Sequence, residues 1–284
     1  MRPGGGGSFR STRFARGARA LLLEVKAAAE AGLKNYFRYS AWLVTDIVTT
    51  PAWLVLLVTP ILLFLPRERW SDPLTLNFIF WGFILWDVVS AGLWSFGMAI
   101  RREQQAGTLE FLMLTNASRA VLFSRNLYPR SLGLALSLVY VYAFFRAIFG
   151  VEVLLLNPLG VAAVLLAGMA ASLGFGLVYG ALVFNFKNVG PLNNILQFVL
   201  LGLSGVFLPL TLYPEPLRTA ALASPFTYVA DLLRFYAMGA QTVLDPAAEW
   251  LALALYTAAL LLAGTASLSL VERRLKKTGG LGAY

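Results

Sequence analysis

Two aspartates stand inside long apolar runs of this sequence, which is an unusual place for a charged side chain. Asp46 lies in the run Ser40–Leu65, and Asp87 lies in the run Asn77–Ala99. A carboxylate at the centre of a membrane helix costs about 2.5–3.5 kcal/mol on insertion scales, so it usually faces a polar path or a partner helix. A proton or ion relay and structural hydrogen bonding between helices are both open. No basic residue is expected at matching depth, which favours the structural role.

Three amide side chains stand close together in another apolar run, Pro191–Leu212. They are Asn193, Asn194 and Gln197. Amides in this position can line a polar path, or they can form hydrogen bonds between packed helices. Both roles remain open at this point.

The residue types exclude several kinds of chemistry. The sequence contains no cysteine and no histidine. Disulfides and Cys/His metal sites are therefore excluded, and no imidazole is present for acid–base catalysis. A lipid-modifying enzyme would need clustered ionisable groups at headgroup depth, and the two aspartates lie in different runs. We therefore predict that the chain is not an enzyme and holds no metal.

A charged and polar segment, Arg101–Arg119, separates two of the apolar runs. Gly107 and Thr108 are typical of a helix start, and Glu110 in the first turn would complement the helix dipole. A helix of about two turns is marginal on its own and needs a surface to dock on. We predict a short docking helix over 107–118 on the cytosolic side, in preference to a connecting loop on the lipid.

The elements that would position these residues are membrane helices. The chain has 284 residues, of which 58% are hydrophobic and 13% charged, against about 25% charged in soluble domains. About 20 apolar residues are enough to cross a bilayer as a helix. Six runs qualify: Ser40–Leu65, Asn77–Ala99, Ser131–Gly150, Asn157–Phe184, Pro191–Leu212 and Ala248–Leu270. We predict an all-α membrane protein whose six transmembrane helices occupy residues 40–271.

The basic residues predict how the chain is oriented. Most of the 23 Lys and Arg residues fall before residue 40, within 101–130, or after residue 271. The positive-inside rule then places both termini in the cytosol. We predict a flexible, basic, Gly-rich arm over 1–18 and a basic cytosolic tail over 272–284. The formal net charge of +9 is explained by topology and contact with anionic lipid, and no nucleic-acid partner is expected.

An amphipathic helix is predicted over 19–38, just before the first span. Lys26, Glu30 and Lys34 recur every four residues, a spacing that places them on one face of a helix. Apolar residues recur on another face at spacings of three and four. A basic amphipathic helix before a cytosolic membrane entry is typical of an interfacial helix.

Two short apolar helices are predicted between the fifth and sixth spans, over 214–243. They are separated at Ser224–Pro225 and are too short to cross the bilayer. We predict that they are re-entrant helices at the outer side, where protein must bury their broken ends. Asp231 and Arg234 lie one turn apart and are expected to pair locally.

The fourth span carries small residues at a strict four-residue spacing. They are Gly168, Ser172, Gly176 and Gly180. A stripe of small residues lets another helix approach closely. We predict tight helix packing along this stripe.

Three stretches, taken in this order, resemble the transmembrane subunits of type-2 ABC exporters. The first is the pattern E-x-x-x-GTLE-x-L-x-x-T-x-x-SR, matched by Glu103, Gly107, Thr108, Leu109, Glu110, Leu112, Thr115, Ser118 and Arg119. The second is P-x-x-L…L-x-SP-x-x-Y-x-x-D-x-x-R, matched by Pro214, Leu217, Leu222, Ser224, Pro225, Tyr228, Asp231 and Arg234. The third is the basic ending ERRLKKTG. The resemblance covers residues 19–279 and departs at Asn116, where a proline is common.

The resemblance implies a permease subunit of the cell (inner) membrane. Such subunits pair as homodimers or heterodimers and sit on two ATP-binding subunits, which hold the ATP and Mg²⁺. The chain itself has no G-x-x-x-x-G-K-[ST] phosphate loop. The matched residues of the first pattern would form the coupling helix. The outer helices, with Pro225, Tyr228, Asp231 and Arg234, would form the external gate.

The implied cargo is a drug-like, lipid or other amphipathic molecule. Its candidate path residues are Asp46, Asp87, Asn193, Asn194 and Gln197. A lipid-linked polysaccharide is an alternative cargo within the same family. An ion-coupled secondary transporter is an alternative mechanism, which would show paired broken spans in repeated halves and buried ion ligands.

Overall fold

Every regular element in the described residues is a helix. The computed structural model describes residues 23–34, 36–38, 40–64, 66–108, 111, 121–122, 125–183, 186 and 189–278. The α-helices are α2 (Ser40–Phe64), α3 (Pro73–Ser90), α4 (Ala99–Gln105), α7 (Leu127–Phe149), α8 (Pro158–Leu182), α9 (Gly190–Leu203), α10 (Glu215–Ala221), α11 (Pro225–Met238) and α12 (Pro246–Thr278). A π-helical segment, Ala91–Gly97, joins α3 to α4.

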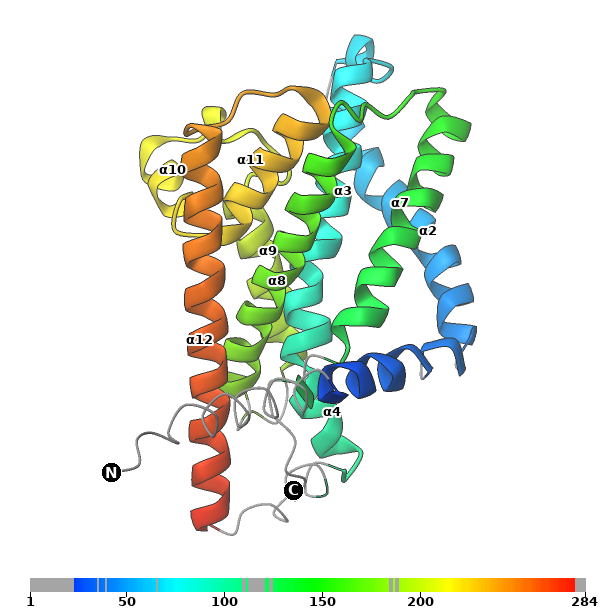
Figure 1. The fold of residues 1–284 in the computed structure, drawn as a ribbon. Coiled ribbons are helices and arrows are strands. Elements are labelled where there is room, and N and C mark those ends of the chain that lie inside the picture. The colour runs from blue at the N-terminus through cyan, green and yellow to red at the C-terminus, as the bar shows by residue number, and fades with distance from the viewer. Residues whose placement is uncertain are drawn as a thin grey trace, which may run out of the picture.

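The long helices form an elongated bundle with different features at its two ends (Figure 1). Helices α3, α7, α8 and α12 run along the long axis of the bundle. The helix over 23–34 lies across the bundle at one end, near α4. The short helix α10 lies toward the opposite end. The predicted interfacial helix and the predicted outer segment therefore lie at opposite ends of the molecule.

Four helices among the described residues are long and apolar enough to cross a membrane. They are Pro73–Glu103, Leu127–Phe149, Pro158–Leu182 and Pro246–Val271. The first and fifth predicted spans correspond to shorter apolar helices, Ala52–Phe64 within α2 and Gly190–Leu203. The number of six crossings therefore stays a prediction.

The predicted fifth span, Pro191–Leu212, extends too far. Helix α9 ends at Leu203, and the chain turns at Ser204 and Gly205. Gly205 has a φ of +69°, which is a left-handed conformation that favours glycine. The apolar residues that follow form irregular chain and a short 3₁₀ turn, Leu210–Leu212, rather than a continuing helix.

Two helices begin at side-chain caps followed by proline. Asp72 accepts a hydrogen bond from the backbone N–H of Thr75 at 3.0 Å before α3, and Asn157 accepts one from Gly160 at 2.9 Å before α8. Each cap satisfies a backbone donor that the first helical turn leaves without a partner. The Thr75 hydroxyl also donates to Asp72 at 2.6 Å. These two hydrogen bonds lower the pKa of the Asp72 carboxyl.

The π-helical segment Ala91–Gly97 interrupts the second span. Its wider turns move the following residues out of the α-helical register. The guanidinium of Arg102 donates through Nη2 to the carbonyl of Ser95 at 2.6 Å. One carbonyl of the distorted segment is thereby satisfied from the next helix.

The small residues of α8 bring it into close contact with its neighbours. A Cβ on Gly176 would lie 2.4 Å from the Cβ of Phe96, so the π-helical segment packs directly on this position. The Ser172 hydroxyl donates to the carbonyl of Val88 at 2.6 Å. The tight packing predicted for this stripe is confirmed at these positions.

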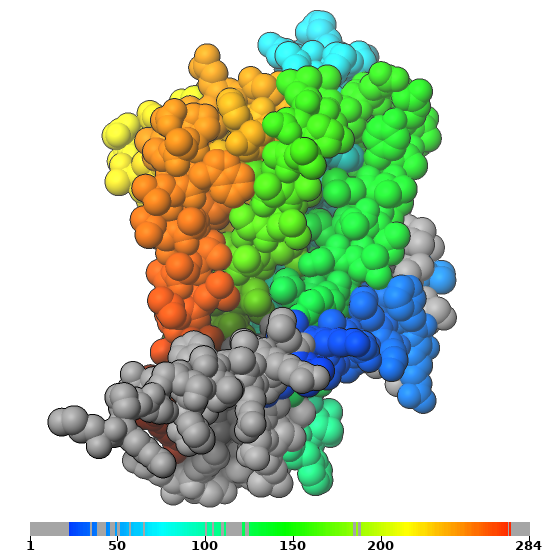
Figure 2. All heavy atoms as spheres, in the orientation of Figure 1, coloured from blue at the N-terminus to red at the C-terminus, as the bar shows by residue number. Residues whose placement is uncertain are grey.

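Helices α8 and α12 lie side by side along the molecule (Figure 2). A Cβ on Gly174 of α8 would lie 2.9 Å from the Cβ of Leu260. A Cβ on Gly264 of α12 would lie 2.6 Å from the Cβ of Leu177. Each helix therefore places a glycine against the other. A movement of one helix relative to the other would break these close contacts.

The helix over 23–34 packs against the beginning of α7. A Cβ on Gly32 would lie 2.4 Å from the carbonyl oxygen of Arg125. On the exposed side, Lys26 Nζ and Lys34 Nζ each lie 3.9 Å from the Glu30 carboxylate. The predicted face of alternating charge is confirmed. Residues 19–22 of the predicted helix lie outside the described residues.

Candidate functional site

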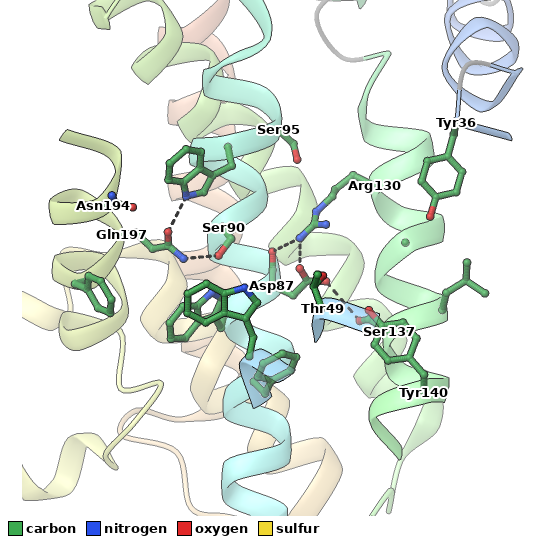
Figure 3. A pocket seen from close by; sticks show the side chains of 17 residues that line it. Tyr36, Thr49, Asp87, Ser90, Ser95, Arg130, Ser137, Tyr140, Asn194 and Gln197 are labelled. Atoms are coloured by element: carbon green, nitrogen blue, oxygen red, sulfur yellow. Dashed lines mark hydrogen bonds and ion pairs between the residues drawn. The ribbon is translucent and has the colours of Figure 1, made fainter. Parts of the chain in front are cut away.

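A cavity of about 530 Å³ lies between α2, α3, α7 and α9 (Figure 3). Small-molecule sites have volumes of roughly 300–1,000 Å³. The lining combines aromatic rings with polar groups. The aromatic residues are Tyr36, Trp53, Phe83, Trp86, Trp94, Tyr140 and Phe198. The polar and charged residues are Thr49, Asp87, Ser90, Ser95, Arg130, Ser137, Asn194 and Gln197.

An ion pair joins α3 to α7 at the wall of this cavity. Arg130, in the first turn of α7, donates through Nη2 to Asp87 Oδ1 and also to the Asp87 carbonyl at 3.2 Å. Ser137 Oγ lies 3.4 Å from Asp87 Oδ2. Asp87 stands at about the middle of the 31-residue span. The expectation that no basic residue lies at its depth is wrong, because the long Arg130 side chain reaches Asp87 from the beginning of another helix.

The amide of Gln197 bridges α9 to the second span. Its Oε1 accepts a hydrogen bond from the indole N–H of Trp94 at 2.7 Å, and its Nε2 donates to Ser90 Oγ at 2.7 Å. Figure 3 shows this chain of side chains at the cavity wall. Gln197 thus borders the cavity and also fixes the position of the Trp94 ring.

The other candidate path residues occupy different environments. Asn194 is exposed and borders the cavity. Asn193 is buried, and its Oδ1 accepts a hydrogen bond from the Tyr179 hydroxyl of α8. Asn193 therefore makes an interhelical hydrogen bond. Asp46 belongs to α2, and its side chain lies outside what the structure describes.

A second group of polar residues lies at the end of α4. We call this group, Glu103, Thr108 and Arg125, the Glu103 clasp. Glu103 Oε2 accepts a hydrogen bond from the Thr108 hydroxyl at 2.5 Å, and Glu103 Oε1 forms an ion pair with Arg125 Nη2. The Glu103 side chain is 13% exposed. One carboxylate therefore binds both ends of the segment 108–125.

Gly107 ends α4 rather than beginning the next helix. Its φ is +67°, and the Thr108 N–H donates to the Glu103 carbonyl at 3.0 Å. A glycine in this conformation, followed by this hydrogen bond, is the Schellman type of helix end. Gly107 itself therefore belongs to the end of α4, while the helix predicted over 107–118 stays a prediction. The remaining residues of the predicted coupling helix lie outside the described residues: Leu109, Glu110, Leu112, Thr115, Ser118 and Arg119.

The predicted gate residues lie on α11. Pro225 is its first residue and is buried. The Tyr228 hydroxyl donates to the Leu222 carbonyl at 2.7 Å, which closes the turn between α10 and α11. Asp231 Oδ2 accepts from the backbone N–H of Val243 at 3.3 Å, which ties the following loop to the helix.

Arg234 binds the break in the chain after α9. Its two terminal nitrogens donate to the carbonyls of Gly205 at 2.6 Å and Val206 at 2.7 Å. Its guanidinium carbon lies 3.6 Å from the ring centroid of Phe78, and the residue is 4% exposed. The hydrogen bonds of Arg234 thus go to these two carbonyls, and the local pair predicted with Asp231 is not its main interaction.

Sequence reasoning missed Arg130, Ser90 and Ser137 as residues of the cavity. Serine within an apolar run carries no signal of its own, since it is common where helices pack closely. A signal for Arg130 existed, because it immediately precedes a span and the second span contains an unpaired carboxylate. Pairing the two required the three-dimensional arrangement of α3 and α7.

The chain matches a known family over most of its length. Residues 24–238 match the model of the ABC-2 type transporter family. The matched part contains the residues of the cavity, the Glu103 clasp and the two helices α10 and α11. No curated protein sequence matches the chain.

Proposed function

Because this chain belongs to the ABC-2 type transporter family, a family of membrane transport domains, we propose that it is the permease subunit of an ATP-binding-cassette exporter. The observation that carries the proposal is the family match over the helices that surround the cavity. In this proposal two permease copies, identical or different, sit on two ATP-binding subunits. Those subunits hold ATP and Mg²⁺, and the permease performs no hydrolysis itself.

The cavity between α2, α3, α7 and α9 is the substrate path in this proposal. Its aromatic walls suit a drug-like, lipid or other amphipathic cargo. We place the second copy beside α9, where Asn194 is exposed. An amide exposed at bilayer depth is costly against lipid, and its neighbours Ile195 and Phe198 are 65% and 60% exposed. A facing permease or the path itself would remove Asn194 from the acyl chains.

The pairing of Asp87 favours this function over an ion-coupled transporter. An ion or proton relay needs a carboxylate that can release and take up its cation. The Arg130 guanidinium already neutralises Asp87.

The Glu103 clasp supports the proposed coupling role of the segment that follows α4. The carboxylate binds Thr108 and Arg125, and the Arg125 carbonyl lies against Gly32 of the helix over 23–34. A displacement of the segment by an ATP-binding subunit would therefore reach both α4 and this helix. Helices α10 and α11, at the other end of the bundle, are proposed as the external gate.

Purification from the native membrane tests the function. We expect an ATP-binding subunit to copurify in a fixed ratio, and its hydrolysis in proteoliposomes to rise when an amphipathic compound is transported. Purified permease that associates with no ATPase under these conditions, yet transports in response to an ion gradient, would contradict the proposal.

The orientation can be tested with single cysteines, since the natural chain has none. Ser71 and Ala106 are both exposed, and they lie just before and just after the second span. We propose that the Ala106 end and both termini are cytosolic. Ser71→Cys should then react with a membrane-impermeant maleimide in intact cells, and Ala106→Cys only after permeabilisation. The reverse labelling pattern would invert the topology.

A further inference from the structure

The charges of the described residues that border the cavity cancel. Among the described residues that line it, Asp87 is the acid and Arg130 the base. The two side chains pair directly, yet Asp87 remains 20% and Arg130 27% exposed. The pair therefore reaches the open space of the cavity instead of being sealed between helices.

Both members of the pair keep hydrogen-bonding capacity for a ligand. A guanidinium has five N–H donors, and a carboxylate accepts about four hydrogen bonds. Arg130 binds Asp87 through Nη2, and Ser137 lies near the second carboxylate oxygen. A ligand head group can therefore approach the pair without separating it.

We propose that this cavity selects amphiphiles of zero net charge that carry a hydrogen-bonding head group. The head group lies at the Asp87–Arg130 pair, and the apolar part lies against the aromatic walls, which include Trp53, Trp86 and Phe198. A ligand with one net charge would leave that charge uncompensated beside an already balanced pair. An uncompensated charge in a weakly polar site is costly.

This inference deepens the proposed function, because it names the chemistry of the cargo at the proposed path. It also predicts how the charge preference of the cavity changes when either member of the pair is replaced. Without Asp87, the cavity retains a lone cation and should prefer anions. Without Arg130, it retains a lone anion and should prefer cations.

Equilibrium binding to the permease alone, in nanodiscs of a zwitterionic lipid, tests the inference. Four dansyl probes share one aromatic body and differ in charge: dansylamide is uncharged, Nε-dansyl-lysine is zwitterionic, dansylglycine is anionic and dansylcholine is cationic. Energy transfer from tryptophan reports binding, since Trp86 and Trp94 border the cavity. Empty nanodiscs measure partition of each probe into the bilayer.

We expect the wild-type protein to bind the uncharged and zwitterionic probes at least about tenfold more tightly than either charged probe, since a charged probe leaves water for a site that does not compensate its net charge. Asp87→Asn should shift the preference toward dansylglycine. Arg130→Gln should shift it toward dansylcholine. The double variant Asp87→Asn/Arg130→Gln restores neutrality and should restore the original ranking, which makes it the matched control.

The order of probe affinities for the wild-type protein tests the inference even if a variant does not fold. A charged probe that binds the wild-type protein as tightly as the uncharged probes would overturn the inference. Single variants that fold and keep the wild-type ranking would overturn it as well. Because no ATPase is present, this outcome is separate from the proposed exporter function, which fails only when the ATP-binding subunit does not associate.

Discussion

Replacing Arg234 with methionine is expected to destabilise the permease by about 3 kcal/mol. The substitution keeps most of the volume of the side chain and removes both donors to the carbonyls of Gly205 and Val206. Those carbonyls lie between α3 and α11, where a Cβ on Gly82 would come within 2.8 Å of the Val206 oxygen. Water has little access there, so the carbonyls would lose their partners without replacement.

The measurement is the apparent melting temperature of the purified protein in detergent. A loss of this size corresponds to about 10 °C for a domain of this length. Arg234→Lys should give an intermediate decrease, because an ammonium lacks the planar fork that reaches two carbonyls. Arg146→Met is the matched control. Arg146 forms an ion pair with Glu152 in which the Arg146 side chain is 54% and the Glu152 side chain 80% exposed. Exposed ion pairs contribute about 0–1 kcal/mol to stability. An unchanged melting temperature for Arg234→Met would show that the break after α9 does not depend on this side chain.

Glu103→Ala is expected to reduce cargo-stimulated ATP hydrolysis about tenfold while the ATP-binding subunit stays bound. This factor lies toward the lower end of the usual range for coupling between sites, which is about 5–150-fold. The carboxylate binds Thr108 and Arg125 on either side of the proposed coupling segment. Without this carboxylate, the ATP-binding subunit can displace the segment without displacing α4 or the helix over 23–34. Closure of the ATP-binding subunits is then not transmitted to the permease.

Charge exchange separates this role from a general loss of stability. The variant Glu103→Arg with Arg125→Glu rebuilds the ion pair in reverse and should recover a substantial part of the stimulation. Glu152→Gln removes a carboxylate from the exposed ion pair with Arg146 and should leave stimulation unchanged. Full stimulation in Glu103→Ala, measured in proteoliposomes at equal ATPase occupancy, would remove the Glu103 clasp from the coupling mechanism.

Hydropathy predicted most helices to within a few positions. The fourth predicted span, Asn157–Phe184, corresponds to α8, because its apolar run and the helix have nearly the same bounds. The end of α9 was not predictable in the same way. The apolar run continues past Leu203 through Val206–Leu208, so hydropathy does not indicate where the helix ends. The boundary is set by the left-handed Gly205 and by carbonyls that bind Arg234, a residue 29 positions further along the chain.

The candidate site was likewise only partly predictable from the sequence. The polar types of Asp87, Asn194 and Gln197 were visible in the sequence, and all three border the cavity. Which amide would turn inward to another helix was not visible. Asn193 is adjacent in sequence to Asn194, yet it is the one that meets Tyr179. One residue changes the direction of a side chain by about 100° around a helix of 3.6 residues per turn, so only the packing of α8 against α9 distinguishes them.

The close packing of α8 against α12 makes bilayer thickness a variable for this protein. The apolar stretch Pro246–Val271 has 26 residues, or about 39 Å of helix, whereas the hydrocarbon core is about 30 Å thick. Such a hydrophobic mismatch is relieved by tilting the helix or by thickening the surrounding lipid. The glycine contacts at Gly174 and Gly264 oblige α8 to follow any tilt of α12. We therefore expect acyl-chain length to change the angle of α8, the helix on which the second span packs.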